Sequence, residues 1–327
     1  MSSTPASDAA AFAPFAGFWR RVAAFLVDGL ILGLVGYALG LALFDVFVRI
    51  GPWGPCVGFV VGLAWFVPQE SARGGQSLGK RLLRIRVVDA QGLTLGPAHG
   101  AVRFAVLAAP YFLLGAALPM DVTTFAGGVP LALVALGGLT ALAYLLAFNR
   151  RTRQSLHDLA VGAFVVRATA GARHAPGPSR AWRGHLAIAG VLALLAGTMP
   201  LFHPRLTHAR ELGDLRSLGR RLAAQPELRS VNVFEAEPRV YSTEFSGVRR
   251  ELSIQATIVR PLDDYVPLST RTAGIALAAF PAAAHEDLIS VRLAYGFDIG
   301  IASSWTANEL ALKPEQWADR VAAGVGG

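Results

Sequence analysis

Five long apolar segments dominate this sequence and restrict what it can fold into. A helix rises ~1.5 Å per residue, so roughly 17 to 25 residues cross a ~30 Å hydrocarbon core. The chain is 53% hydrophobic and only 16% charged, which favours burial of these segments in a bilayer. We therefore predict an α-helical polytopic membrane bundle of about five transmembrane helices, at residues 22–44, 50–68, 101–119, 128–148 and 186–202.

The C-terminal part of the chain has a different composition. Residues 1–202 contain 7 of the 22 acidic side chains, and residues 203–327 contain the other 15. The hydrophobic periodicity of this part indicates the order α-β-β-α-β-β-α. This order predicts a soluble two-layer α+β domain. The expected helices are 206–225, 266–280 and 315–321, and the expected strands are 230–240, 251–260, 288–296 and 298–306.

Basic residues predict the orientation of the bundle. With a cytoplasmic N-terminus, the inner segments contain 15 Lys and Arg residues, whereas the two short outer loops contain only Arg49. The positive-inside rule favours this arrangement, and five crossings then place the C-terminal domain outside the cytoplasm. Anionic lipid headgroups are the expected partners of the basic loops. Nucleic acid is not expected, because residues 203–327 carry 14 Lys and Arg against 15 acidic residues.

Asp28 lies inside the first apolar segment, seven residues after Arg21. The two side chains project from nearly the same helix face, ~10 Å apart along the axis. An ionisable side chain at this depth is costly, so it faces protein or water and marks a functional position by default. We therefore name Arg21 and Asp28 as the first candidate site residues.

Two cytoplasmic loops contain the other motifs. Residues 74–80 read GGQSLGK and fit part of a phosphate-binding loop, but Arg81 replaces the hydroxyl residue that would hold Mg²⁺, and no strand precedes the motif. The continuation to residue 96 predicts a hairpin with its turn at Gln91 and Gly92. In the second loop, Asp158 suits the first turn of a helix. A second interpretation makes Asp158 an acceptor for Arg21.

We predict no disulfide, metal or cofactor. Cys56 is the single cysteine, and the seven histidines show no zinc spacing. The dipeptide His157-Asp158 does not make a catalytic dyad without a nucleophile, and His285 begins a polar turn ahead of a strand. We therefore do not expect an enzyme.

Three motifs, in this order, resemble the RDD family of bacterial membrane proteins. They are RRVAAFLVD at 20–28, GGQSLGKRLLRIRVVDAQG at 74–92 followed by Arg103, and RTRQSLHDLAVGAFVV at 151–166. The family name refers to one arginine and two aspartates, which correspond here to Arg21, Asp28 and Asp158. The resemblance implies a multi-helix domain in the bacterial inner membrane that is suspected of transporting unidentified ligands. It gives no guidance on the fifth helix or the C-terminal domain.

These observations predict five consecutive regions. They are a disordered cytoplasmic N-terminus at 1–16, an RDD-like membrane domain at 17–167 with four helices and a cytoplasmic hairpin at 70–100, a cytoplasmic linker at 168–185, a fifth transmembrane helix at 186–202, and an extracytoplasmic α+β domain at 203–327.

Two functional hypotheses remain open. In the first, the bundle transports an ion or small solute, with Asp28 as a titratable or coordinating group and Lys80, Arg103 and His157 as auxiliary residues. In the second, Arg21, Asp28 and Asp158 form a structural ion-pair network, and the protein is a membrane-anchored module whose outer domain binds a protein partner. Replacement of Asp28 by Asn would abolish flux in the first case and lower the folded yield in the second.

Overall fold

The computed structural model describes residues 14–72, 74–115, 125–168, 180–199, 209–236, 239–241, 246–248 and 250–324. Residues 1–13 of the segment that was expected to be disordered, and most of the predicted linker, lie outside these ranges. The chain forms two compact units. The membrane unit comprises residues up to Leu39, Trp53–Phe202 and Ile299–Ala302, and the α+β unit comprises Gly40–Pro52, His203–Asp298 and Ser303–Gly327.

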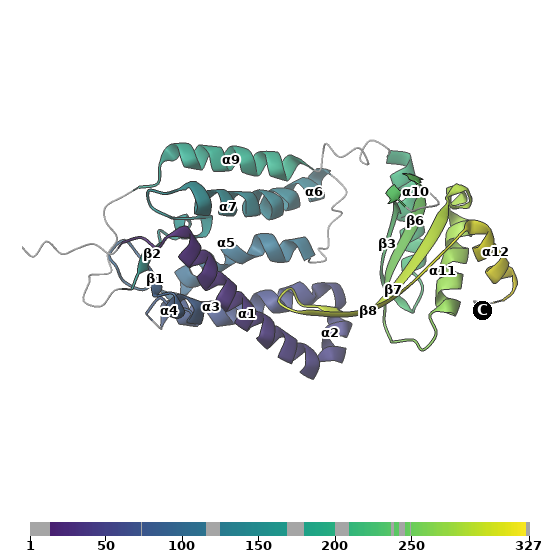
Figure 1. Cartoon of the computed structure of the whole chain (residues 1–327), viewed down its shortest axis with the longest axis horizontal. Coiled ribbons are helices and arrows are strands. Elements are labelled where there is room, and N and C mark those ends of the chain that lie inside the picture. The colour runs from purple at the N-terminus through teal and green to yellow at the C-terminus, as the bar shows by residue number, and fades with distance from the viewer. Residues whose placement is uncertain are drawn as a thin grey trace, which may run out of the picture. The chain divides into compact units, whose positions relative to one another are not determined.

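Four stretches of the described chain are long and apolar enough to cross a membrane: Phe18–Ala42, Phe44–Ser71, Pro97–Gly115 and Gly127–Phe148. They correspond to the first four predicted spans, with ends shifted by up to six residues. In Figure 1 the helices Gly54–Ser71, Pro97–Gly115 and Gly138–Phe148 run roughly parallel, and Phe18–Ala42 lies at an angle to them. The helices of the membrane unit are α1 (Phe18–Ala42), α3 (Gly54–Ser71), α5 (Pro97–Gly115), α6 (Phe125–Ala132), the π-helical turn η2 (Leu133–Gly137) and α7 (Gly138–Phe148).

The fifth predicted segment contains a shorter helix, α9 (Arg183–Thr198). Its 16 residues span ~24 Å, and the predicted residues 200–202 lie outside the described ranges. The helix packs closely on η2: a Cβ atom added to Gly137 would lie 2.7 Å from the carbonyl oxygen of Ala193. Small residues permit this close approach of helices within a membrane.

A small sheet joins the two loop motifs at 74–92 and 151–166. Strand β1 (Ile85–Val88) pairs antiparallel with β2 (Phe164–Arg167), and the short helices α4 (Leu78–Leu82) and α8 (Leu156–Leu159) precede them. The predicted hairpin within residues 74–96 is therefore wrong. The Asp89 carboxylate accepts the N–H groups of Gln91 and Leu93 and holds a turn, but β2 rather than a local return strand supplies the partner.

The α+β unit contains a four-stranded sheet in the order β3-β6-β7-β8, in which β6 and β7 are parallel and the other pairs antiparallel. The unit begins with the α1–α3 connection, where Phe44 and Phe47 of α2 contact Phe297, with ring centroids 5.4 and 5.5 Å apart. Its elements are α2 (Phe44–Ile50), α10 (Ala209–Ala223), β3 (Leu228–Ala236), β4 (Arg239–Tyr241), β5 (Ser246–Val248), β6 (Glu251–Ile258), α11 (Val266–Ala279), β7 (Leu288–Asp298), β8 (Ser303–Leu312) and α12 (Pro314–Ala322).

The predicted element order of this unit agrees with the structure, apart from two details. The short pair β4 and β5 was not predicted, since each strand has only three residues. The last strand lies at 303–312 rather than 298–306, because β7 continues to Asp298 before the chain reverses.

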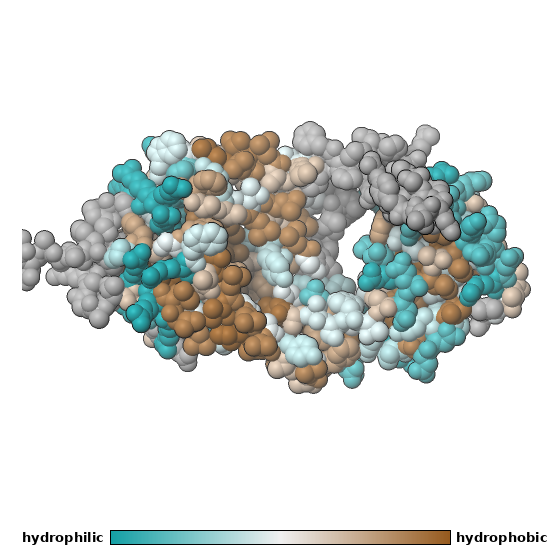
Figure 2. Space-filling model, in the orientation of Figure 1, coloured by the Kyte–Doolittle hydropathy of each residue, from teal (hydrophilic) through white to brown (hydrophobic). Residues whose placement is uncertain are grey.

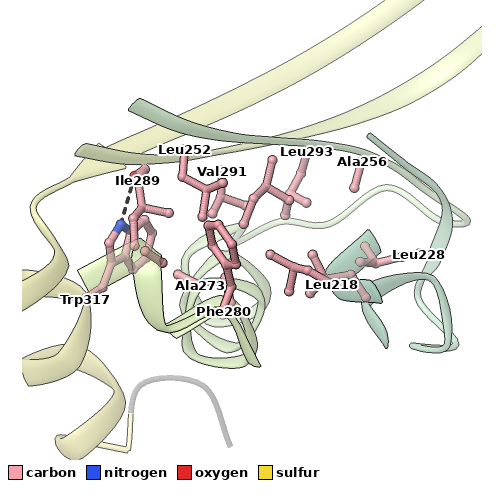
Figure 3. Close-up of a cluster of buried hydrophobic side chains, with 14 of the residues drawn as sticks. Leu218, Leu228, Leu252, Ala256, Ala273, Phe280, Ile289, Val291, Leu293 and Trp317 are labelled. Carbon is pink, nitrogen blue, oxygen red and sulfur yellow. Dashed lines mark hydrogen bonds between the residues drawn. The ribbon is translucent and has the colours of Figure 1, made fainter. Parts of the chain in front are cut away.

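The core of the α+β unit lies between the sheet and its helices. Figure 3 shows Leu252 of β6 and Val291 and Leu293 of β7 directed toward side chains from α10 and α11. Trp317 of α12 is fully buried, and its indole N–H donates to the carbonyl oxygen of Ile289 at 2.9 Å. The unit therefore has a hydrophobic core of its own.

Candidate functional site

Charged residues from five elements meet at the end of the membrane unit that contains the β1–β2 sheet. Figure 2 shows hydrophilic side chains gathered at this end and a hydrophobic surface along the helices. The contributing residues are all buried or nearly so: Arg21 of α1, Glu70 of α3, Lys80 of α4, Arg103 of α5 and Asp158 of α8.

Arg103 is the centre of this network. Its Nη1 donates to Glu70 at 2.6 Å, and its Nε and Nη2 donate to Asp158 at 3.0 and 2.7 Å. Glu70 also forms an ion pair with Lys80 at 2.5 Å. One guanidinium therefore joins the ends of α3 and α5 to α8, with the planar fork geometry that makes arginine suited to two carboxylates.

Arg21 reaches Asp158 from the opposite side. Its Nη2 lies 2.5 Å from Asp158 Oδ2, and its Nη1 donates to the carbonyl oxygen of Arg153. Asp158 also accepts the backbone N–H of Ser155 at 3.1 Å. Both interpretations of Asp158 from the sequence are therefore confirmed, because it sits in the first turn of α8 and also accepts Arg21.

Asp28 has different partners from those predicted. Its carboxylate accepts the hydroxyl of Ser77 and, at 2.8 Å, the backbone N–H of Gly79, so it holds the start of α4 against α1. Arg21 lies almost two turns from Asp28 along α1. It pairs with Asp158 instead, and no ion pair joins Arg21 to Asp28 in the described part of the chain.

Ser77 connects Asp28 to the rest of the network, because its hydroxyl also accepts from Lys80 at 3.3 Å. The complete network then contains three cations and three carboxylates: Arg21, Lys80 and Arg103 with Asp28, Glu70 and Asp158. Their formal charges cancel. This balance of charge matters because a buried charge that lacks a partner is strongly destabilising.

The environment of α8 shifts the pKa of two neighbouring groups. Burial is the largest influence on His157 and lowers its pKa to about 3, although the adjacent Asp158 acts in the opposite direction. Burial alone raises the pKa of Asp158, but Arg21, His157 and Arg103 together hold it well below its usual range. His157 is therefore neutral and Asp158 ionised at physiological pH.

His157 leaves one polar atom without a partner. Its Nε2 lies 3.3 Å from Asp158 Oδ1, whereas the buried Nδ1 has no hydrogen-bond partner among the described residues. With the proton on Nε2, Nδ1 is an acceptor that a bound molecule could use.

A cavity of about 180 Å³ lies beside the network, and His157 contributes to its wall. Five of the lining side chains are ionisable: Arg21, Glu70, Lys80, Arg103 and His157. The other eight are apolar: Val22, Phe25, Phe66, Ile85, Phe104, Leu107, Leu146 and Val165. The lining therefore contains three cations, one carboxylate and the neutral His157.

Two network members were not singled out from the sequence. Glu70 lies two residues after the second predicted span, which ended at residue 68, but α3 continues to Ser71 and Glu70 is buried. Ser77 stood inside the GGQSLGK motif. In the structure this motif leads into α4. The carboxylate of Asp28 accepts the backbone N–H of Gly79, so this N–H is not available to a phosphate, and the motif does not act as a phosphate-binding loop here. In the described ranges, no group of three or more His, Cys, Asp or Glu residues is placed to hold a metal ion.

Comparison with known proteins gives one family. Neither a curated protein nor a solved structure matches the chain. The matched family region covers the four spans, the β1 loop and α8, and thus every member of the charge network. Residues 15–162 match the model of the RDD family, so the membrane domain is an RDD-family domain, as its three motifs predicted.

Proposed function

We propose that the RDD domain binds a small anionic or zwitterionic solute in the cavity beside the charge network and translocates it across the membrane. The observation that carries this proposal is the mixed lining of that cavity, in which five ionisable side chains accompany eight apolar ones. A ligand site is typically a largely apolar concavity with a few convergent polar groups.

In this proposal the network supplies the binding groups, and Asp28 has a structural role. Asp28 is fully buried and does not line the cavity. An incoming carboxylate or phosphate could take one of the cations from Glu70, while the unpartnered Nδ1 of His157 accepts a hydrogen bond from the solute. Glu70 would keep its other cationic partner in this exchange, so the carboxylate is not left buried without a cation.

Filling the cavity without altering a charge tests the proposal. Leu107→Trp should reduce flux in reconstituted vesicles at least tenfold, measured for chloride, acetate, inorganic phosphate, Na⁺ and protons. Leu114→Trp is the matched control, since Leu114 lies on the same helix, outside the cavity wall, with 54% of its surface exposed. Flux through Leu107→Trp equal to that of the control would refute the proposal.

The alternative is a non-transporting membrane anchor whose α+β unit binds a protein partner. The closed, neutral network favours it, because every carboxylate already has its partners. A folded wild-type protein that moves none of these ions would support this second candidate. In that case Asp28→Asn should lower the folded yield, because Asp28 holds the start of α4 against α1.

We further propose that the N-terminus is cytoplasmic and that α9 is a fifth crossing in the inner membrane, with the α+β domain outside. The basic residues support the orientation. The α1–α3 connection, which is an outer loop in this topology, belongs to the α+β unit. A 16-residue helix can cross when the bilayer thins or flanking residues snorkel. Protease added to spheroplasts should therefore digest the C-terminal unit and spare the β1 loop.

A further inference from the structure

A second cavity, separate from the solute cavity, lies at the start of α1. It measures about 430 Å³ and is lined by Gly17, Phe18, Trp19, Arg20, Ala147, Arg150, Arg153 and Arg167. Three chain segments thus supply four arginines to one concave surface, and none of the lining residues is acidic. We propose that this cavity binds the phosphodiester headgroup of an anionic phospholipid.

The charge of this surface is uncompensated. Arg20, Arg150, Arg153 and Arg167 form no ion pair with any carboxylate in the described ranges. This contrasts with Arg21 and Arg103, whose charges the network cancels. Arginine forks are suited to phosphate oxygens, which they contact with two parallel hydrogen bonds.

The backbone keeps these arginines together. Ala16 donates to Val165 at 2.8 Å, and Arg167 donates to Pro14 at 2.9 Å, so the entry to α1 runs along β2. Arg153 has a positive φ of 58°, and its carbonyl oxygen is held by Arg21. The first turn of the 25-residue α1 adds free N–H groups and the positive end of the helix dipole.

The position of the cavity along the spans indicates a lipid ligand. The first span begins at Phe18 and the fourth ends at Phe148, so both borders of the cavity lie where helices leave the hydrocarbon. Trp19 is 77% exposed there, and Trp182, just before α9, is 55% exposed. Exposed tryptophans at helix ends mark the headgroup level, and basic pockets between helices at this depth suit anionic headgroups.

The test uses the full chain in phosphatidylcholine nanodiscs that contain phosphatidylglycerol, with bound lipid counted by native mass spectrometry. Arg150→Gln with Arg167→Gln should lower retention of phosphatidylglycerol about fivefold for each arginine removed. Arg81→Gln with Arg151→Gln is the matched control, because both arginines are exposed and lie outside the cavity. Equal loss in the two double variants would overturn the assignment.

A second measurement on folded wild-type protein shows whether the ligand of this cavity is a lipid or a free anion. Brominated phosphatidylglycerol should quench the fluorescence of Trp19, taken as the difference from Trp19→Phe, more strongly than brominated phosphatidylcholine does. Millimolar inorganic phosphate should leave this quenching unchanged. Equal quenching by the two lipids, or relief by phosphate, would overturn the proposal even if the double arginine variant fails to fold.

Discussion

In the membrane unit a group of charged side chains is buried beside the apolar residues of the β1–β2 sheet, whereas the described part of the α+β unit buries no charged side chain and has an aliphatic and aromatic core. Arg103 and Asp158 are 4% and 0% exposed in the first, and Leu218, Ile254 and Trp317 are each 0% exposed in the second. The same chain therefore uses two kinds of interior.

The surrounding medium explains this difference. Phe25, Leu26, Leu30 and Leu34 of α1 are all more than half exposed, which suits contact with lipid tails. Burying such side chains between helices would gain little, because lipid is as apolar as they are. In the α+β unit, water provides the driving force for an apolar core. Helix association in the membrane unit therefore depends on close packing and on the charge network.

The largest effect is expected for Arg103→Gln. The substitution leaves Glu70 and Asp158 with one cationic partner each inside the protein, at a cost of ~3–5 kcal/mol. SDS-induced unfolding of the detergent-solubilised chain measures it. Arg81→Gln removes the same charge at an exposed site and should change stability by less than ~0.5 kcal/mol. Similar losses in the two variants would mean that the network contributes no more than surface charge does.

Trp317→Ala tests the other interior. It removes a fully buried ring and its hydrogen bond to Ile289, so the α+β unit should lose ~3–5 kcal/mol. Urea titration of the full chain, followed by protease cleavage within residues 250–324, measures this loss. Trp305→Ala serves as the comparison, since Trp305 is 46% exposed and should tolerate the change.

Gly79→Ala tests close packing beside the network. A Cβ at Gly79 would lie 2.1 Å from the carbonyl oxygen of Ala24 and 3.0 Å from Asp28 Cγ, so α4 must move, at a cost of ~1–3 kcal/mol. Gly29→Ala on α1 meets nothing within 4 Å and should be neutral or slightly stabilising. Thermal unfolding of both variants in detergent compares them, and an undisturbed Gly79→Ala protein would contradict the packing.

The smallest effect is a pH dependence that His157 introduces. Its pKa falls from 6.5 to about 3 on folding, so the unfolded chain binds a proton that the folded chain rejects, and stability falls as the pH drops below 6.5. The loss by pH 5.5 should be ~1 kcal/mol. Asp158 adds nothing in this window, because its contribution is lost only below its unfolded pKa of 3.8. SDS titrations at pH 7.5 and 5.5 measure the free energy of unfolding. This free energy should differ less between the two pH values in His157→Gln than in the wild type.

Several features could be predicted because their signals are local. A run of apolar residues indicates a span wherever it occurs, and the alternation of Ile289, Val291 and Leu293 indicates a strand with one buried face. The three motifs identified the RDD domain and its arginine and aspartates. The return strand after Gly92 was predicted wrongly by the same local reasoning, because the true partner β2 lies about 80 residues further along the chain.

Composition and periodicity were thus sufficient to predict the membrane spans and the order of elements in the α+β unit. They were also sufficient to predict that charges lie in the bundle, where burial is costly. The identity of each charge's partner depended on the folded bundle. Arg21 and Asp158 are 137 residues apart in sequence, and Arg103 and Glu70 are 33 apart. Helix geometry relates neighbours within a few residues, whereas ion pairs between helices depend on where each helix ends and how it is rotated, and these follow from packing of the whole bundle.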